Sequence, residues 1–163
     1  MSKRLLYHSY NTRRISIFKK VLMLLSLVLS IYLTGCATVP MASIEDDQLR
    51  KQFSAPSEGK AGVYIYRNSN FGSALKKEVY IDEQLVGVTA PMTYFYKEVS
   101  SGQHKLSTQS EFGNNDLVIM TDPGLNYYVR QYIKMGVFVG GANLELVPEE
   151  DGKKGVSECK LAK

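Results

Sequence analysis

The sequence predicts an all-β protein: a small antiparallel β-sandwich of immunoglobulin-like architecture that follows an N-terminal helical signal segment. Two observations support this fold class. From Lys60 onward, short runs of alternating apolar and polar residues are separated by turn residues, and no helical period follows Gly59. Near the N-terminus, the thirteen-residue run Val21–Leu33 is apolar and carries no charge.

The N-terminal region is typical of a secretory signal peptide. Six basic residues and no acidic ones precede the apolar run: Lys3, Arg4, Arg13, Arg14, Lys19 and Lys20. As a helix, the run extends about 20 Å, whereas the hydrocarbon core of a bilayer is about 30 Å thick. The alternative is a true membrane anchor lengthened through Ile15–Phe18, but Lys19 and Lys20 interrupt that extension. We therefore assign residues 1–35 to a signal peptide.

Leu33-Thr34-Gly35-Cys36 closes the apolar run and resembles the lipobox of bacterial lipoproteins. The resemblance implies that a signal peptidase recognises Leu33, Thr34 and Gly35 and cuts before Cys36, whose thiol carries a diacylglycerol. Two or more acyl chains anchor a protein to a membrane stably, whereas a single chain does not. An Asp at the next position is typical of retention in the inner membrane. Ala37 therefore implies the outer membrane, facing the periplasm, if the host is Gram-negative.

The chain after the predicted cut is close to neutral. Its 128 residues contain 14 Lys and Arg against 16 Asp and Glu, so the net charge of +4 belongs to the leader. No basic domain is left to attract a nucleic acid, and we predict no such partner. Because lipid occupies Cys36, Cys159 has no intramolecular partner. Cys159 is either a thiol packed beside the last strand or the site of an intermolecular disulfide.

Residues 36–59 are predicted to form a lipid-anchored tether. Its two ends, Ala37–Pro40 and Ser54–Gly59, are rich in small residues and helix breakers. Between them, Ser43 is a suitable N-cap for a short helix through Gln52, with an acidic residue three positions later.

Eight short strands are expected in the remaining domain, residues 60–163. They are Gly62–Arg67, Lys77–Ile81, Leu85–Thr89, Thr93–Val99, Gln103–Ser110, Asp116–Thr121, Tyr127–Lys134 and Asn143–Val147. The tightest hairpin is expected at Asp82-Glu83-Gln84, and the other connections contain Gly, Pro, Asn, Asp or Ser.

Alternation within these strands predicts an aliphatic buried face with tyrosines at its margins. The residues on that face are Val63, Ile65, Val79, Ile81, Val86, Val88, Leu117, Ile119, Tyr127, Val129, Ile133, Leu144 and Leu146. Four charged residues are expected to meet water, namely Lys77, Glu78, Lys105 and Glu145.

The order of several motifs resembles a PEGA-type repeat, from about Lys60 to Val147. The positions concerned are Val79–Asp82, Gly87, Thr89, Pro91, Val99–His104, Pro123-Gly124 and Tyr127–Val129. The opening Ala61–Arg67 is similar to the start of a family of uncharacterised bacterial lipoproteins with a PEGA-like domain. The resemblance implies a PEGA-like sandwich that binds or assembles at the cell envelope, with no enzymatic activity. We expect no cofactor. Asp82-Glu83 departs from the usual Asp-Gly, and we expect a longer turn there.

The residues themselves also offer little for catalysis or metal binding. His104 is the only histidine after the leader, and one imidazole cannot form a site with two or three histidine ligands. Neither Ser100 nor Ser101 lies in the strand–turn–helix elbow that a nucleophilic serine needs. We expect His104 to be exposed after a glycine turn. The segment Glu149–Gly155 is expected to be a solvated turn of mixed charge.

Two features could bind a partner. Alternate positions of one predicted strand, Tyr128, Arg130, Tyr132 and Lys134, place two aromatic and two cationic side chains on one face. This face either binds a glycan, through ring stacking and charge-assisted hydrogen bonds, or is simply solvated. The glycine-flanked apolar segment Met135–Gly141 is either a core-packed loop or an exposed patch for a protein partner or a membrane surface.

Together these features predict a lipid-anchored cell-envelope protein that is not an enzyme. Its domain is expected to act as an interaction or structural module for an envelope protein partner. The alternative is a lipoprotein that binds peptidoglycan or another glycan through the face of Tyr128, Arg130, Tyr132 and Lys134.

Replacement of the predicted lipidation site tests the anchor. Cys36→Ala removes the thiol that is to be acylated, and with it the modification that precedes cleavage. We expect an uncleaved precursor that takes up no labelled fatty acid, measured by metabolic labelling and gel electrophoresis. A Cys36→Ala protein that is still cleaved and labelled would contradict the lipobox assignment.

Overall fold

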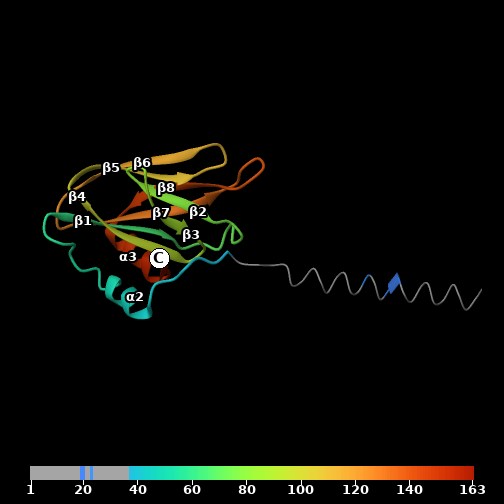
Figure 1. Cartoon of the computed structure of the whole chain (residues 1–163), viewed down its shortest axis with the longest axis horizontal. Helices are drawn as coiled ribbons and strands as arrows, with labels where there is room; N and C mark the ends of the chain where they lie inside the picture. The colour runs from blue at the N-terminus through green and yellow to red at the C-terminus, as the bar shows by residue number, and fades with distance from the viewer. Residues whose placement is uncertain (1–18, 21–22, 24–36) are drawn as a thin grey trace, which may run out of the picture. The chain divides into compact units, whose positions relative to one another are not determined.

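The computed structural model describes residues 19–20, 23 and 37–163, of which residues 37–163 form one compact unit. Figure 1 shows the strands and helices of this unit. The predicted lipobox, Leu33–Cys36, and most of the leader lie outside the described residues. Within the described part of the chain, no helix combines the length and the apolar character needed to span a membrane.

Two β-sheets packed against each other form the unit, which confirms the predicted all-β sandwich. One sheet has four strands in the order β3-β2-β5-β6, and the other has five in the order β8-β7-β1-β4-β9. The strands are β1 (Lys60–Arg67), β2 (Lys77–Ile81), β3 (Gln84–Thr89), β4 (Thr93–Ser100), β5 (Gly102–Gln109), β6 (Asn114–Thr121), β7 (Asn126–Lys134), β8 (Gly141–Val147) and β9 (Lys160–Leu161). All eight predicted strands are present, and β9 is an additional short one.

The sandwich is not antiparallel throughout, which corrects the expected topology. The four-stranded sheet is antiparallel, but β1 pairs in parallel with β7, and β4 pairs in parallel with β9. Parallel neighbours cannot be joined by a tight hairpin and need a long crossover connection. Here the chain between β1 and β7 forms β4 and the whole four-stranded sheet. β7 therefore returns beside β1 and runs in the same direction.

Aliphatic side chains fill the space between the two sheets. The buried members are Val63, Ile65, Val79, Ile81, Leu106, Ile119, Val129 and Leu144. Alternation predicted all of these except Leu106. Of the other expected core residues, Leu146 is 48% exposed because it lies near the end of the edge strand β8.

A second buried layer lies on the other face of the five-stranded sheet. It contains tyrosines of β1, β4 and β7 that were expected at the margins of the core: Tyr64, Tyr66, Tyr94 and Tyr128, with Val156 and Cys159. The rings of Tyr64 and Tyr128 stack with their centroids 5.2 Å apart. Helices α2 (Ile44–Arg50), capped by Ser43 as predicted, and α3 (Glu149–Ser157) pack on this side of the sheet (Figure 1).

Helix α3 lies where a solvated turn was expected: it covers all of Glu149–Gly155 and continues to Ser157. Its two glycines, Gly152 and Gly155, are buried. A Cβ on Gly152 would overlap the side chain of Tyr128, and a Cβ on Gly155 would overlap the ring of Tyr66. Their lack of side chains lets the helix backbone approach the tyrosine layer closely. The low helix propensity of glycine also explains why the sequence pattern conceals this helix.

Residues 37–59 belong to the folded unit and do not form a free tether. The backbone N–H of Ala37 donates a 3.0 Å hydrogen bond to the carbonyl of Ser73, and Met41 forms a β-bridge with Ala162. The compact unit thus begins directly after the predicted lipidation site.

The close contact of α3 with the tyrosine layer predicts the effect of Gly152→Ala. The added methyl group must displace the ring of Tyr128, and such overpacking costs about 1–3 kcal/mol. The higher helix propensity of alanine offsets about 1 kcal/mol of this cost. We expect the free energy of unfolding to fall by up to about 2 kcal/mol in urea titrations. Lys154→Ala, on the exposed side of the same helix, should change it by less than about 0.5 kcal/mol. Stabilisation by Gly152→Ala would show that the glycine is not needed for packing.

Candidate functional site

The four residues predicted to bind a ligand lie on β7, but only part of their face is exposed. Tyr128 is 1% exposed in the layer beneath α3, so its ring cannot stack on a sugar. Arg130 forms an ion pair with Glu145 on β8. Tyr132 is half-buried, and its hydroxyl accepts a hydrogen bond from a β8 side chain. Lys134 is exposed at the end of the strand. The structure therefore does not form these residues into one continuous surface.

A polar cavity of about 430 Å³ lies beside Arg130 and is lined by residues of β1, β7, β8 and α3. Arg130 and Lys154 are its cationic residues. They are outnumbered by the carboxylates of Glu145, Asp151 and Glu158. This balance of charge disfavours an anionic glycan at this position.

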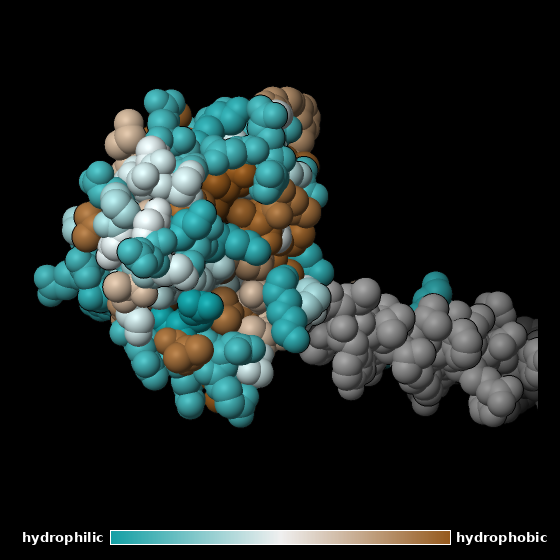
Figure 2. All heavy atoms as spheres, turned by 60° about the vertical axis from the view of Figure 1, so that its left-hand side comes forward, coloured by the Kyte–Doolittle hydropathy of each residue, from teal (hydrophilic) through white to brown (hydrophobic). Residues whose placement is uncertain are grey.

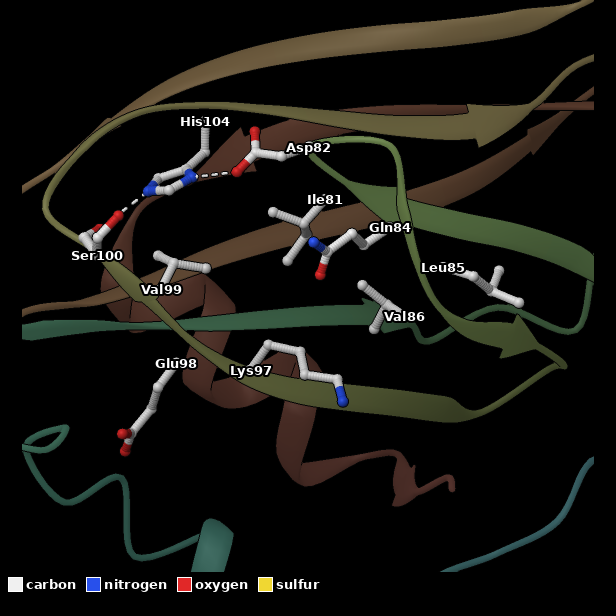
Figure 3. A pocket seen from close by; sticks show the side chains of 10 residues that line it. All are labelled: Ile81, Asp82, Gln84, Leu85, Val86, Lys97, Glu98, Val99, Ser100 and His104. Carbon is white, nitrogen blue, oxygen red and sulfur yellow. Dashed lines mark hydrogen bonds and ion pairs between the residues drawn. The ribbon is translucent and has the colours of Figure 1, made fainter.

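A second cavity, of about 300 Å³, contains His104, which bridges the β2–β3 turn and the end of β4 (Figure 3). His104 is 7% exposed, which corrects the expectation of an exposed imidazole. Its Nδ1 is 2.6 Å from Oδ2 of Asp82, and its Nε2 is 2.9 Å from the carbonyl oxygen of Ser100. Asp82 also accepts a 2.9 Å hydrogen bond from the backbone N–H of Lys105.

The partners of the imidazole favour its charged form. A carboxylate and a backbone carbonyl can only accept, so both ring nitrogens carry a proton and donate. Burial lowers the pKa of His104, but the hydrogen bonds to Asp82 and Ser100 outweigh burial and raise it overall. The hydrogen bond from His104 holds the pKa of Asp82 below its ordinary value. His104 thus joins two turns, and neither ring nitrogen is free to act as a general base.

The turn at Asp82 and Glu83 is shorter than the resemblance to the repeat implied. β2 ends at Ile81 and β3 begins at Gln84, so the loop has two residues, with φ angles of 49° and 68°. Positive φ at both positions defines a type I′ turn, which usually contains Asn-Gly or Asp-Gly. The hydrogen bonds of the Asp82 carboxylate to β5 hold this conformation without a glycine.

Two cationic side chains beside the β1–β2 connection are buried. Arg67 is fully buried and donates hydrogen bonds to the carbonyls of Phe71, Gly72 and Leu75, which holds this connection in place. Lys77, which was expected to meet water, is 4% exposed. Burial lowers the pKa of both side chains.

Cys159 is a packed thiol, one of the two interpretations of the sequence. It is free and buried among the tyrosines. Burial raises the pKa of Cys159 to about 12. The thiol therefore stays protonated at neutral pH, where it is a poor nucleophile.

The segment Met135–Gly141 is exposed and is not a core-packed loop. Met135 and Phe138 are 87% and 85% exposed. Glu111, in the β5–β6 connection, accepts hydrogen bonds from three consecutive backbone N–H groups of this segment, those of residues 137–139. We call the exposed apolar side chains of these two connections the loop tip: Phe112, Met135, Val137, Phe138 and Val139.

Within residues 37–163, α2 and α3 pack on the five-stranded sheet, and no other element of this part of the chain covers the outer face of the four-stranded sheet, which we call the open face. Cross-strand pairing places four apolar side chains on this open face in two groups, Tyr80 with Leu85 and Val118 with Met120, and polar residues of β5 lie between the groups. The last three are 55%, 56% and 64% exposed. The space-filling view in Figure 2 shows hydrophobic side chains gathered in patches among hydrophilic ones on one side of the unit.

This chain is similar to a family and to a protein whose descriptions name no function. The model of the family described as "Protein of unknown function (DUF2846)" matches residues 57–142, which span β1 to β7 and the start of β8. An uncharacterised protein of Haemophilus influenzae is 55% identical over 133 residues, which cover 82% of this chain and 79% of that protein. No solved structure matches the chain significantly.

The paired carboxylate and imidazole predict a pH-dependent stability that Asp82→Asn removes. The pKa of His104 is raised above 6.5, so its contribution is complete below that pH and is lost as the pH rises through the folded-state pKa. The pKa of Asp82 is lowered below 3.8, so its contribution is complete above that pH and is lost as the pH falls through the folded-state value. We expect the wild type to exceed the variant in free energy of unfolding by about 1 kcal/mol at about pH 5.5, because Asp82 is half exposed. The difference should shrink under alkaline conditions.

Urea titrations over a pH series measure this difference. Asparagine tolerates the left-handed backbone of the turn, so the turn itself should persist in the variant. Glu83→Gln, at the exposed neighbouring position, is the matched control and should differ from the wild type by less than about 0.5 kcal/mol. A difference for Asp82→Asn that does not vary with pH would show that the pair carries no charge.

Proposed function

We propose that this chain, which belongs to the DUF2846 family of proteins of unknown function, is a lipid-anchored cell-envelope protein whose PEGA-like sandwich is a non-catalytic interaction module. The signal peptide is cleaved between Gly35 and Cys36, and Cys36 carries the lipid. In a Gram-negative host, Ala37 favours the outer membrane, with the domain facing the periplasm. The open face binds another envelope protein.

The start of the folded unit supports a cut before Cys36. The unit comprises residues 37–163, so removal of residues 1–35 takes nothing from either sheet or from α2 or α3. A lipid on Cys36 would lie one residue away from the folded unit. The position of the lipobox motif, Leu33–Cys36, thus agrees with the boundary of the folded unit.

The open face is the observation on which the binding role depends. Leu85, Val118 and Met120 are apolar side chains that remain more than half exposed on an ordered sheet, and burial of the exposed part of each would gain about 1–2 kcal/mol. Lys105 and Gln103 lie opposite Val118 and Met120 on β5 and supply polar groups within the same face. Apolar groups with polar surroundings on a rigid surface are typical of protein–protein interfaces.

The polar residues give less support to the other functions. His104 is engaged at both nitrogens, which favours a structural role over catalysis. For glycan binding, Tyr128 is buried and Arg130 is paired with Glu145, so only Tyr132 and Lys134 remain available from the predicted face. The open face offers a larger exposed apolar surface than these two residues do.

Site-specific photo-cross-linking in the living host tests the proposal. A photoreactive phenylalanine analogue at Val118 is expected to capture one discrete envelope protein, identified by mass spectrometry. The same analogue at Glu150, an exposed position on α3, is the control and should not give that product, because α3 lies on the other side of the sandwich.

Two results would contradict the proposed role. Equal capture from both positions would mean that the open face has no special affinity. Recovery of cell-wall fragments in place of a protein would indicate that the domain binds a glycan. Tyr132→Ala would then be expected to weaken binding to purified cell-wall sacculi.

A further inference from the structure

We infer that the loop tip inserts into the interfacial region of the membrane that carries the lipid anchor, so that the domain rests on the bilayer with a defined end. This inference depends on the proposed acylation of Cys36. The loop tip would then be a second membrane contact beside the lipid, and the opposite end of the sandwich would face away from the membrane.

The proposed lipid on Cys36 and the folded unit are separated by a very short stretch of chain. Ala37 is the residue after Cys36 and is already bound to the unit through its hydrogen bond to Ser73. Consecutive Cα atoms are about 3.8 Å apart, so a lipid on Cys36 holds this edge of the unit within a few ångströms of the headgroups. The chain therefore contains no spacer that would let the domain stand away from the bilayer.

The loop tip lies at the same end of the sandwich as Ala37. Ser73 belongs to the β1–β2 connection, and the coloured trace in Figure 1 begins at the end where the β1–β2, β5–β6 and β7–β8 connections lie. Leu75 of the β1–β2 connection also lies against Gly140 of the β7–β8 segment. The residue that follows the anchor and the loop tip are thus linked through one set of packed connections.

The loop tip is held in an exposed position by ordered contacts. The carboxylate of Glu111 binds three backbone N–H groups of the β7–β8 segment, and Asn115 of β6 donates a 2.6 Å hydrogen bond to the carbonyl of Ala142. The apolar side chains therefore point outward from a supported backbone. Phe71 of the β1–β2 connection, 55% exposed, adds a further aromatic ring at this end.

The surroundings favour a lipid surface as the occupant. Lys134 directly precedes the apolar segment and Lys76 ends the β1–β2 connection, and both are exposed. Within the described residues, neither forms an ion pair. Exposed apolar side chains flanked by lysines suit the membrane interface, where the rings enter the acyl boundary and the ammonium groups meet anionic headgroups. Since the lipid already brings this end to the bilayer, we commit to the bilayer as the partner.

Tryptophan fluorescence of the full lipidated protein tests this inference. The chain has no tryptophan, so Phe138→Trp introduces a single probe at the loop tip, at a position exposed enough to accept it. The protein is reconstituted into vesicles of phosphatidylethanolamine and phosphatidylglycerol, with and without brominated phospholipid. We expect emission at shorter wavelength than in detergent-free buffer and strong quenching by the brominated lipid.

Leu125→Trp supplies the matched control. Leu125 is 53% exposed in the β6–β7 connection, at the opposite end of the sandwich, and its tryptophan should emit as in water and remain unquenched. Absence of quenching at position 138, in protein that carries labelled palmitate, overturns the inference while the lipid anchor stands. Equal quenching at both positions overturns the defined orientation. Absence of palmitate on Cys36 overturns the proposed function and this inference together.

Discussion

Strand β1 is buried on both faces, and much of the remaining structure follows from the need to cover it. Its alternate residues point to different layers: Val63 and Ile65 enter the aliphatic core between the sheets, whereas Tyr64 and Tyr66 lie under the helices. A strand with two apolar faces requires a packed layer on each side. The four-stranded sheet supplies one layer, and α2 and α3 supply the other. Arg67, at the end of the strand, then orders the β1–β2 connection, to which the residue after the predicted anchor is bound.

Local patterns were sufficient for the strands but not for the helical layer. Alternation and turn residues located all eight long strands, since each signal lies within a few residues. The same alternation predicted that tyrosines lie only at the margins of the core, because the sequence near them does not show that helices cover them. Helix α3, which covers them, contains Gly152 and Gly155, and these glycines allow close packing against the tyrosines. Glycine has a low helix propensity, so propensity alone argues against a helix at this position. The parallel pairing of β1 with β7 was also beyond local signals, since it joins segments about sixty residues apart.

The candidate sites show the same division between local and tertiary information. The apolar character of Met135–Gly141 was visible in the sequence, but its exposure depends on Glu111, which lies in another connection. Pairing of His104 with Asp82 likewise joins two strands, and no spacing rule predicts it. In the resulting arrangement the two ends of the sandwich differ chemically. One end carries the loop tip and Ala37, while the other carries the charged His104–Asp82 pair.

The most direct test of the lipid anchor is the intact mass of the wild-type protein extracted from the envelope of its host. We expect a chain that begins at Cys36, with additional mass equal to a diacylglycerol, and with a third acyl chain if the host also acylates the freed amine. A mass that includes residues 1–35, or a cleaved chain without acyl groups, would contradict the anchor and would remove the reason to place this domain against a membrane.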